Sequence, residues 1–253
     1  MMSIDLNADL GEGMGTDEAL LEIVSSASIA CGGHAGDAAT IRHILEICKA
    51  RGVRAGAHPG YADKLRFGRF RVVMPLDELL GQIRSQMVLV RTIADEVGVP
   101  LAYVKLHGAL ANQTAEELAF AVGIFATIHA MDPKMAVLAL DNSQQVRAAK
   151  AVGLPLIREA YADRAYTGEG LLVPRNEDGA VIHDLGAVIK RCVRLARAGE
   201  IVAIDGSVLQ SSARSICLHG DTPGAVDLAR EVRQALEADG IAIEATPPEA
   251  VPI

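Results

Sequence analysis

Along the whole chain, short apolar runs typical of β-strands alternate with longer runs typical of amphipathic helices. In the helical runs apolar residues recur at steps of three and four, as in residues 38–52 and 114–131. This alternation indicates a parallel α/β architecture. Seven runs are predicted to be strands: residues 3–10, 26–31, 53–58, 102–107, 135–140, 154–162 and 215–220.

Local signals mark where some of these elements begin and turn. Asp37 is predicted to cap the helix that follows it, and Thr114, with Glu117 three residues later, is predicted to cap the helix over 114–131. Residues 169–184 interrupt the alternation and are predicted to form a small hairpin around Asp178–Gly179. Because no linker or internal repeat occurs, we expect residues 1–253 to form a single domain.

Nearly every predicted strand ends in polar, glycine-rich sequence. An open sheet gathers its ligand groups at one switch point, whereas a barrel gathers them from most of its strand ends onto one face. The wide spread therefore predicts a seven-stranded (β/α) TIM-like barrel rather than an open doubly wound sheet. The residues concerned are Asn7, Asp9 and Glu12; Cys31 and His34; His58 and Asp63; Lys105 and His107; Glu159, Asp163 and Arg164; and His219 and Asp221.

Composition narrows the classes of function. Half of the residues are hydrophobic and only 3% are aromatic, so the core must consist mostly of Ala, Val, Leu and Ile. A net charge of -8 without any basic run argues against nucleic-acid binding. The four cysteines are widely spaced and form no C-x-x-C pair, and no apolar leader or membrane-spanning run occurs. We therefore expect a cytoplasmic protein.

Four of the seven histidines, His34, His58, His107 and His219, occupy equivalent positions at strand ends. Any one of them alone is more often an ordinary hydrogen-bonding group than a ligand. Together they predict a shared site, whereas His43, His129 and His183 lie on predicted helices or the hairpin and are assigned no role.

The segment SIACGGHAGD at residues 28–37 has competing interpretations. Its glycines permit positive φ and close approach of a ligand to the backbone. Cys31 either packs or lines the pocket as a small apolar group, or acts as a nucleophile with His34 as its base. A metal site made of Asp9, His34 and His58 is also conceivable, although no compact metal signature such as H-E-x-x-H is present.

Standard nucleotide-binding loops are absent from the sequence. No G-x-x-x-x-G-K-[ST] motif occurs, and the glycines of residues 11–15 are not followed by the last glycine of G-x-G-x-x-G, since Thr16 stands in its place. Lys105 lies inside an apolar strand and is therefore a candidate to stabilise a phosphate or an oxyanion.

Six motifs, in order over nearly the whole chain, resemble the LamB/YcsF family. They are DLNADLGEG, SIACGGHAGD, GAHPGYAD, YVKLHGAL, ADRAYTGEGLLVPR and ICLHGDTPGA. The resemblance implies a barrel of the glycoside hydrolase/deacetylase superfamily. It also implies ATP-dependent hydrolysis of the lactam 5-oxo-L-proline to L-glutamate, since characterised members are the A subunit of prokaryotic 5-oxoprolinase. That enzyme is a complex with separate B and C subunits, and ATP is its co-substrate.

From the motifs and this resemblance we predict a set of site residues. Lactam hydrolysis would use Asp9 as general base, His34 and His58 to orient the water, and Lys105 with His107 to stabilise the oxyanion. Arg164 would pair with the substrate carboxylate, and His219 with Asp221 would complete the acid–base set. The other residues expected to bind substrate are Asn7, Glu12, Cys31 and Asp63.

Three positions depart from the family pattern. Leu106 and Ala111 replace the usual proline and tyrosine, and Phe70 stands where a basic or small polar residue is common, so we expect altered substrate fit.

The sequence is also compatible with two other functions. The first is a stand-alone metal-dependent amidase or deacetylase with Asp9, His34 and His58 as ligands. The second is a non-catalytic scaffold for partner subunits.

Overall fold

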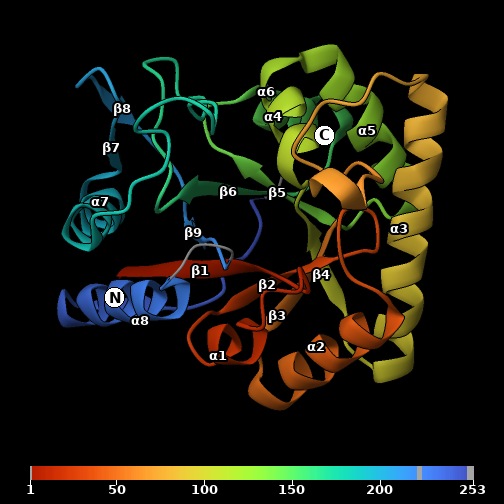
Figure 1. Ribbon diagram of the computed structural model, residues 1–253, viewed down its shortest axis with the longest axis horizontal. Coiled ribbons are helices and arrows are strands. Elements are labelled where there is room, and N and C mark those ends of the chain that lie inside the picture. Colours follow the sequence, from red (N-terminus) through yellow and green to blue (C-terminus); the bar gives the residue numbers. More distant parts are fainter. Residues whose placement is uncertain (1, 221–223, 250–253) are drawn as a thin grey trace.

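A computed structural model describes residues 2–220 and 224–249 of the chain, and its central feature is a closed parallel β-barrel (Figure 1). All seven predicted strands are present, at nearly the predicted positions. They are β1 (Met2–Leu10), β2 (Ser26–Ala30), β3 (Arg54–His58), β4 (Leu101–Val104), β5 (Ala136–Leu140), β6 (Leu156–Tyr161) and β9 (Ser215–Leu218).

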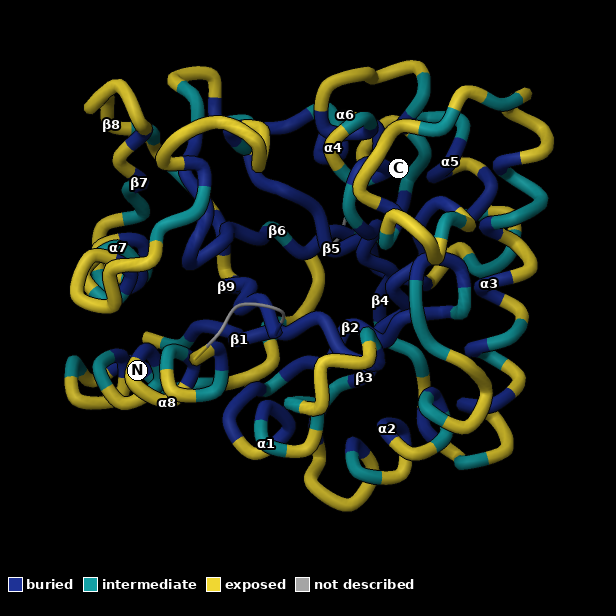
Figure 2. Tube along the Cα trace, in the orientation of Figure 1, coloured by how far each residue is buried: buried dark blue, intermediate teal, exposed yellow. Residues whose placement is uncertain are grey.

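Helices surround these strands on the outside, as expected for strand–helix alternation (Figure 1). Apolar side chains from the outward faces of the strands and from the helices form one large buried core, and in Figure 2 the strands are almost entirely buried. The helices are α1 (Asp17–Leu21), α2 (Ala38–Arg51), α3 (Leu76–Val97), α4 (Gly108–Glu116), α5 (Leu118–Met131), α6 (Gln144–Val152), α7 (Leu185–Ala198) and α8 (Ala225–Ala238), with a 3₁₀ turn, η1, at Lys64–Arg66.

The first and last strands of the barrel pair with each other. The sheet has the order β10-β1-β2-β3-β4-β5-β6-β9, and an additional parallel pairing of β1 with β9 closes it. β10 (Ile241–Ile243) pairs with the first residues of β1, so it lies outside the ring of seven. The seven-stranded TIM-like barrel predicted from the sequence is confirmed.

The inside of the barrel is polar along β1. Asp5, Asn7 and Asp9 alternate with apolar residues of the same strand, and a strand directs alternate side chains to opposite faces. Asp5 is fully buried and accepts hydrogen bonds from Ser26 and from Arg54. Because a buried polar group must find partners, this interior hydrogen bonding is required for stability.

Several details differ from the sequence-based expectations. Residues 169–184 form no paired strands of their own; two isolated antiparallel bridges, Arg164–Val181 and Tyr166–Leu172, tie them back to the loop after β6. A true hairpin lies later, as β7 (Glu200–Val202) and β8 (Val208–Gln210).

The predicted cap at Thr114 is wrong, whereas the one at Asp37 is confirmed. Asp37 accepts a hydrogen bond from the backbone N–H of Thr40 at the start of α2. Thr114 lies inside α4, where its hydroxyl donates to the carbonyl of Leu110, and α5 begins only at Leu118. Among the described residues, no helix combines the length and the apolar character needed to span a membrane.

Candidate active site

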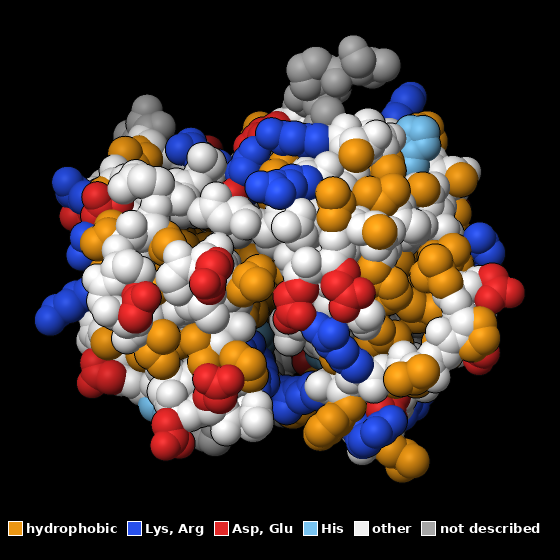
Figure 3. Space-filling view, turned by 90° about the horizontal axis from the view of Figure 1, so that it is seen from above, with side chains coloured by type: hydrophobic (Ala, Val, Ile, Leu, Met, Phe, Trp, Pro, Cys, Tyr) orange, Lys and Arg blue, Asp and Glu red, His pale blue; other side chains and the backbone are white. Residues whose placement is uncertain are grey.

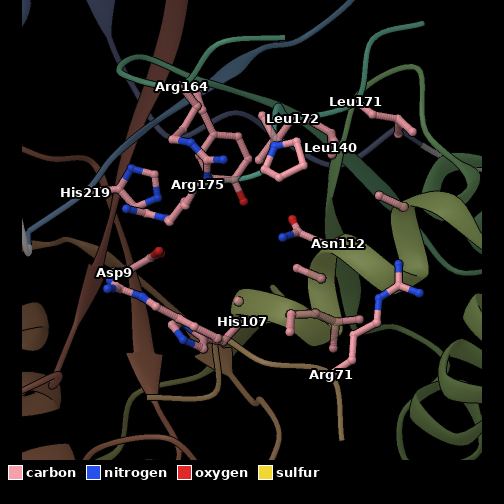
Figure 4. A pocket seen from close by; sticks show the side chains of 18 of the residues that line it. Asp9, Arg71, His107, Asn112, Leu140, Arg164, Leu171, Leu172, Arg175 and His219 are labelled. Carbon is pink, nitrogen blue, oxygen red and sulfur yellow. The ribbon is translucent and has the colours of Figure 1, made fainter. Parts of the chain in front are cut away.

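A cavity of about 690 Å³ opens where the strands of the barrel end. Parallel barrels carry their sites at this carboxyl-terminal face. In Figure 4, Asp9, His107 and His219 lie across the cavity from Asn112 and the leucines. Figure 3 shows basic and acidic side chains beside a hollow near the middle of the molecule. The cavity lining includes Asp9, Glu12, His58, His107, Tyr161 and His219 from the strand ends, and Arg71, Asn112, Arg164, Leu171, Leu172, Arg175 and others from helices and loops.

Behind Asp9, the ammonium group of Lys105 lies at the centre of a network that we call the lysine network. Its Nζ donates to Asp9 Oδ1 at 2.8 Å and to Asn7 Oδ1 at 3.0 Å. Cys217 Sγ lies 3.0 Å and Glu159 Oε2 3.2 Å from the same nitrogen. Lys105 is only 1% exposed, so this charge is held inside the barrel by groups from β1, β6 and β9.

The charges of the lysine network stabilise one another. Burial alone would lower the pKa of Lys105, but the nearby Asp9, Cys217 and Glu159 raise it well above its usual value. Burial would raise the pKa of Asp9, yet His58 and Lys105 hold it well below the usual range. Burial raises the pKa of Glu159 in spite of Lys105. At neutral pH the network therefore contains an ammonium ion and a charged Asp9 carboxylate.

Beside the lysine network, Glu12 and three histidines form a second group, which we call the histidine cluster: Glu12, His34, His58 and His107. Glu12 Oε1 lies 2.9 Å from His34 Nε2, 3.2 Å from His107 Nδ1 and 3.9 Å from His58 Nε2. The nitrogens His107 Nδ1 and His58 Nε2 are 3.1 Å apart. The rings of His34 and His107 stack in parallel with centroids 3.5 Å apart.

Local backbone features make room for the stacked rings. Gly68 has a φ of +61°, and a Cβ there would lie 2.9 Å from the Cβ of His34. Phe67, just before it, has a left-handed φ of 55°, and its carbonyl accepts a hydrogen bond from His107 Nε2 at 2.9 Å. The loop after β3 therefore fixes the orientation of a histidine that follows β4.

Burial and neighbours shift the titration of the histidine cluster. Burial, with help from His107 and His58, lowers the pKa of His34 to about 3 in spite of its bond to Glu12. Burial also lowers the pKa of His107. His58 is the exception, because the Asp9 carboxylate outweighs burial and raises its pKa. Burial would raise the pKa of Glu12, but its contacts with His107 and His34 lower it strongly.

On the other side of Asp9, His219 and Asp163 form a dyad. His219 Nδ1 lies 2.7 Å from Asp163 Oδ1, and the imidazole stacks on Tyr161 with centroids 5.3 Å apart. Burial would raise the pKa of Asp163, but His219 lowers it, so the carboxylate stays charged. The Asp163 carboxylate keeps a hydrogen on His219 Nδ1, which fixes the tautomer and leaves Nε2 free to exchange protons.

The structure distributes the predicted site residues over several positions. Six of them line the cavity: Asp9, Glu12, His58, His107, Arg164 and His219. Asn7, His34 and Lys105 lie directly behind them, at 0%, 1% and 1% exposure, and reach the cavity only through their neighbours. Leu106, Ala111 and Phe70 are lining residues too, so the three departures from the family pattern do face the cavity. Asp221 lies outside the described residues.

Two residues predicted to bind substrate lie away from the cavity. The Cys31 thiol donates to the carbonyl of Ile29, and burial raises its pKa to about 12, so it packs and is no thiolate nucleophile. Asp63 caps η1 and pairs with Arg66. For both, a position after a strand suggested the cavity, but the local turn directs the side chain elsewhere.

Arg164 lines the cavity, but its guanidinium is already engaged. It is 3% exposed and donates to the carbonyls of Val173 and Ala180, which holds the loop after β6 in place. Arg175, on that same loop, also lines the cavity and points into it in Figure 4.

Four groups that the sequence left without a role belong to the site. Glu159 and Asp163 were visible only as polar residues at the end of β6, and Tyr161 and Cys217 as ordinary strand residues. The available signal was alternation, since Ile157, Glu159 and Tyr161 occupy every second position of β6 and therefore face the same side of the sheet. Their partners come from other strands and cannot be paired from one sequence.

Comparison with known proteins agrees with this architecture. Residues 4–251 match the model of the LamB/YcsF family. The chain belongs to the LamB/YcsF family. It is 48% identical over 247 residues, 96% of this chain and 99% of the relative, to the 5-oxoprolinase A subunit of Streptomyces avermitilis. It is 46% identical to a 5-oxoprolinase A subunit of Agrobacterium fabrum, over 96% of this chain and 97% of the relative.

A solved structure of similar sequence has the same fold. The lactam utilization protein from Thermus thermophilus superposes with a TM-score of 0.90 at 34% identity, covering 97% of this chain and 100% of the other. The barrel is therefore that of a LamB/YcsF protein over nearly the full length of its relatives.

Proposed function

We propose that this chain is the A subunit of a 5-oxoprolinase, a hydrolase that opens the cyclic amide 5-oxo-L-proline to L-glutamate. The observation that carries the proposal is the near-complete match, at 46–48% identity, to relatives named as 5-oxoprolinase A subunits. The lactam utilization protein with the same fold supports the same substrate class. The cavity also supports it, since its volume lies within the range of small-molecule sites.

The proposed reaction adds water to the carbonyl carbon of the ring and breaks the bond between that carbon and the ring nitrogen. One water proton ends on the nitrogen, which becomes the amino group of glutamate, and the oxygen becomes part of the new carboxylate. Resonance in the amide opposes this step, so we assign the consumption of ATP to transfer of its terminal phosphoryl group to the amide oxygen, which releases ADP. After ring opening the phosphoryl group is carried by the new carboxyl group, and a second water hydrolyses it to free phosphate. Because the chain has no standard phosphate-binding loop, we place ATP on the B and C subunits of the complex.

His219 is proposed as the group that moves the proton. Its Nδ1 is engaged by Asp163 at 2.7 Å, which leaves Nε2 for the water, and the ring lines the cavity. Asp9 was the first candidate for general base, but its lowered pKa makes its carboxylate a weak proton acceptor. We therefore assign Asp9 to orienting the water with His58, which lies 3.4 Å from its Oδ2.

The remaining roles follow from position. His107 lines the cavity, but its Nε2 donates to the carbonyl of Phe67 and its Nδ1 faces Glu12, so we assign it to positioning Glu12 rather than to the oxyanion; His34 stacks on it from behind. Lys105 does not line the cavity, so it acts through Asp9 as a positioning residue. Arg175 is proposed to bind the substrate carboxylate, since the guanidinium of Arg164 is engaged by two backbone carbonyls.

The test is glutamate release from 5-oxoproline, measured for the purified chain alone and then with the B and C subunits and ATP. We expect ATP-dependent release only from the complete complex, and loss of release with the variant Asp9→Asn. Release by the chain alone without ATP would support the metal-dependent amidase or deacetylase instead. Full activity of the complex with Asp9→Asn and His219→Gln chains would support the scaffold.

A further inference from the structure

The histidine cluster places several hydrogen-bond acceptors at one point. His58 Nδ1 donates to the carbonyl of Lys105 at 2.8 Å, and His107 Nε2 donates to the carbonyl of Phe67 at 2.9 Å. A carbonyl oxygen only accepts, so the nitrogen that faces each carbonyl carries the hydrogen. In the neutral rings the opposite nitrogens, His58 Nε2 and His107 Nδ1, are acceptors that face each other at 3.1 Å, and Asp9 Oδ2 is a further acceptor 3.4 Å from His58 Nε2.

A carboxylate oxygen, Glu12 Oε1, lies near both of these nitrogens. Glu12 Oε1 is 3.2 Å from His107 Nδ1, 3.9 Å from His58 Nε2 and 2.9 Å from His34 Nε2. All four side chains are buried or nearly so, with side-chain exposures between 0% and 8%. Acceptors that converge in a buried place need a cation among them, either a shared proton or a metal ion.

The spacing of the four atoms suits a metal ion, but because His34 and His107 stack in parallel, one of these two rings must turn before both lone pairs point at the same ion. One ligand atom from each of Glu12, His34, His58 and His107 lies within 4.8 Å of the others. Zinc bonds to imidazole nitrogen and carboxylate oxygen at about 2.0–2.2 Å, which places tetrahedral neighbours about 3.3 Å apart. The measured separations of 2.9, 3.1, 3.2 and 3.9 Å bracket this value.

The outer hydrogen bonds also match those of metal-binding histidines. Ligand histidines usually donate their other ring N–H to a carbonyl or carboxylate, which fixes the tautomer and the ring orientation. His58 and His107 do this through the carbonyls of Lys105 and Phe67. These two backbone carbonyls come from different loops, so the arrangement is built by the fold.

A neighbouring set of potential ligands, Asp9, Cys217 and His219, is less suited to a metal ion. There Lys105 Nζ lies 2.8 Å from Asp9 Oδ1 and 3.0 Å from Cys217 Sγ, and its positive charge would repel a second cation. Burial, with the charge of Asp9, also raises the pKa of the Cys217 thiol well above its usual value. The lysine network thus supplies its own cation, whereas the ion pairs of Glu12 with described residues all go to histidines.

We propose that Glu12, His34, His58 and His107 bind one divalent transition-metal ion of the zinc class. This set replaces the set of Asp9, His34 and His58 considered from the sequence. Imidazole and carboxylate ligands favour zinc and similar ions over magnesium or calcium. Glu12, His58 and His107 also line the cavity, so an ion there is reachable from it. The proposal rests on the geometry of the cluster alone and is independent of the proposed lactam hydrolysis.

The test uses the purified full chain, stripped of metal with a chelator and titrated calorimetrically with Zn²⁺. We expect one ion per chain. The variants His58→Ala and Glu12→Gln should each bind at least about 100-fold more weakly, since loss of an outer-shell partner alone costs about 10–100-fold. His43→Ala is the matched control, because His43 is exposed and pairs with Glu18 at 2.9 Å; it should bind like the wild type.

Substitution with Co²⁺ gives a second readout on the unmutated chain, which does not depend on how the variants fold. Nitrogen and oxygen ligands should give visible d–d bands without the near-ultraviolet charge-transfer band of a cobalt–thiolate bond. A thiolate band would place the ion at Cys217 and overturn the proposal. So would absence of stoichiometric binding, which would mean that a shared proton fills the cluster, or undiminished binding by both variants. None of these outcomes depends on whether the complex hydrolyses 5-oxoproline.

Discussion

The lysine network and the histidine cluster lie side by side at the barrel rim, and each holds at least one buried carboxylate group next to different partners. In the lysine network, the ammonium of Lys105 contacts the carboxylates of Asp9 and Glu159 directly. In the histidine cluster, Glu12 faces three imidazoles, two of which already donate their hydrogens to backbone carbonyls. The lysine network therefore contains its own cation, Lys105, whereas the histidine cluster can accept an external one.

The two groups also differ in whether they support the fold or are open to ligands. Lys105 is fully enclosed and does not line the cavity, so its network fixes the floor of the site. Glu12, His58 and His107 do line the cavity, as does His219 beyond Asp9. Apart from Asp9, which also lines the cavity, substitutions in the lysine network should act mainly on stability, and those at Glu12, His58, His107 and His219 mainly on binding or turnover.

The largest expected effect is that of Lys105→Met on stability. Removing the ammonium leaves Asp9 and Glu159 buried without their cation, and breaking a buried pair typically costs about 3–5 kcal/mol. The free energy of unfolding should fall by this amount in urea denaturation. Lys49→Met, at an exposed lysine of α2, is the control and should change stability by no more than about 0.5 kcal/mol. Equal stability of both variants would mean that Lys105 does not hold the network together.

Turnover should respond most to His219→Gln. Loss of a positioned proton-transfer group costs about 10²–10⁴-fold in rate, so glutamate release by the reconstituted complex should fall within that range. The unfolding midpoint should fall only by the small contribution of the pair that His219 Nδ1 makes with the Asp163 carboxylate. His183→Gln, at an exposed histidine, is the matched control. If His219→Gln kept full turnover, the proton would have to move through another group.

Zinc should stabilise the chain through the histidine cluster only. A ligand at 100 times its dissociation constant adds about 2.7 kcal/mol to the stability of the state that binds it. The thermal midpoint of the wild-type chain should therefore rise with added Zn²⁺, and that of Glu12→Gln should not. Glu18→Gln is the control, because Glu18 is exposed and outside the cluster. An equal rise in both variants would contradict the assignment of Glu12 as a ligand.

The smallest predicted effect concerns acid pH at the His219–Asp163 dyad. The folded state lowers the pKa of Asp163, so its stabilising contribution is present above the ordinary aspartate pKa and disappears as pH falls through the lowered value. The stability difference between wild type and Asp163→Asn should therefore be largest near neutral pH and shrink below about pH 4. A difference that stays constant from pH 7 to pH 3 would show that the Asp163 carboxyl group does not titrate in this range with a lowered pKa.

Much of the fold follows from the sequence because each barrel strand is a short apolar run that ends in polar residues. The three-residue strands β7, β8 and β10 were not found, since so few residues show no periodicity. Thr114 and Glu117 match a capping pattern in sequence, but α4 continues through Thr114, whose hydroxyl bonds within that helix. Tertiary packing there outweighs the local signal.

The candidate site was only partly predictable for a different reason. Equivalent positions after β2, β3 and β4 indicated that His34, His58 and His107 would converge, and they do. The contacts of Lys105 with Glu159 and Cys217 join segments 54 and 112 residues apart, and no local pattern pairs them. Asp63 and Asp163 both follow strands, yet only the loop conformation decides that Asp163 meets His219 while Asp63 caps a turn.

The contrast between the two groups is tested most directly by X-ray anomalous scattering at the zinc edge. The sample is a crystal of the full chain grown with Zn²⁺. We expect an anomalous peak among Glu12 Oε1, His34 Nε2, His58 Nε2 and His107 Nδ1, with Lys105 still hydrogen-bonded to Asp9. A peak beside Cys217 and His219, or a map without any peak in the histidine cluster, would contradict it.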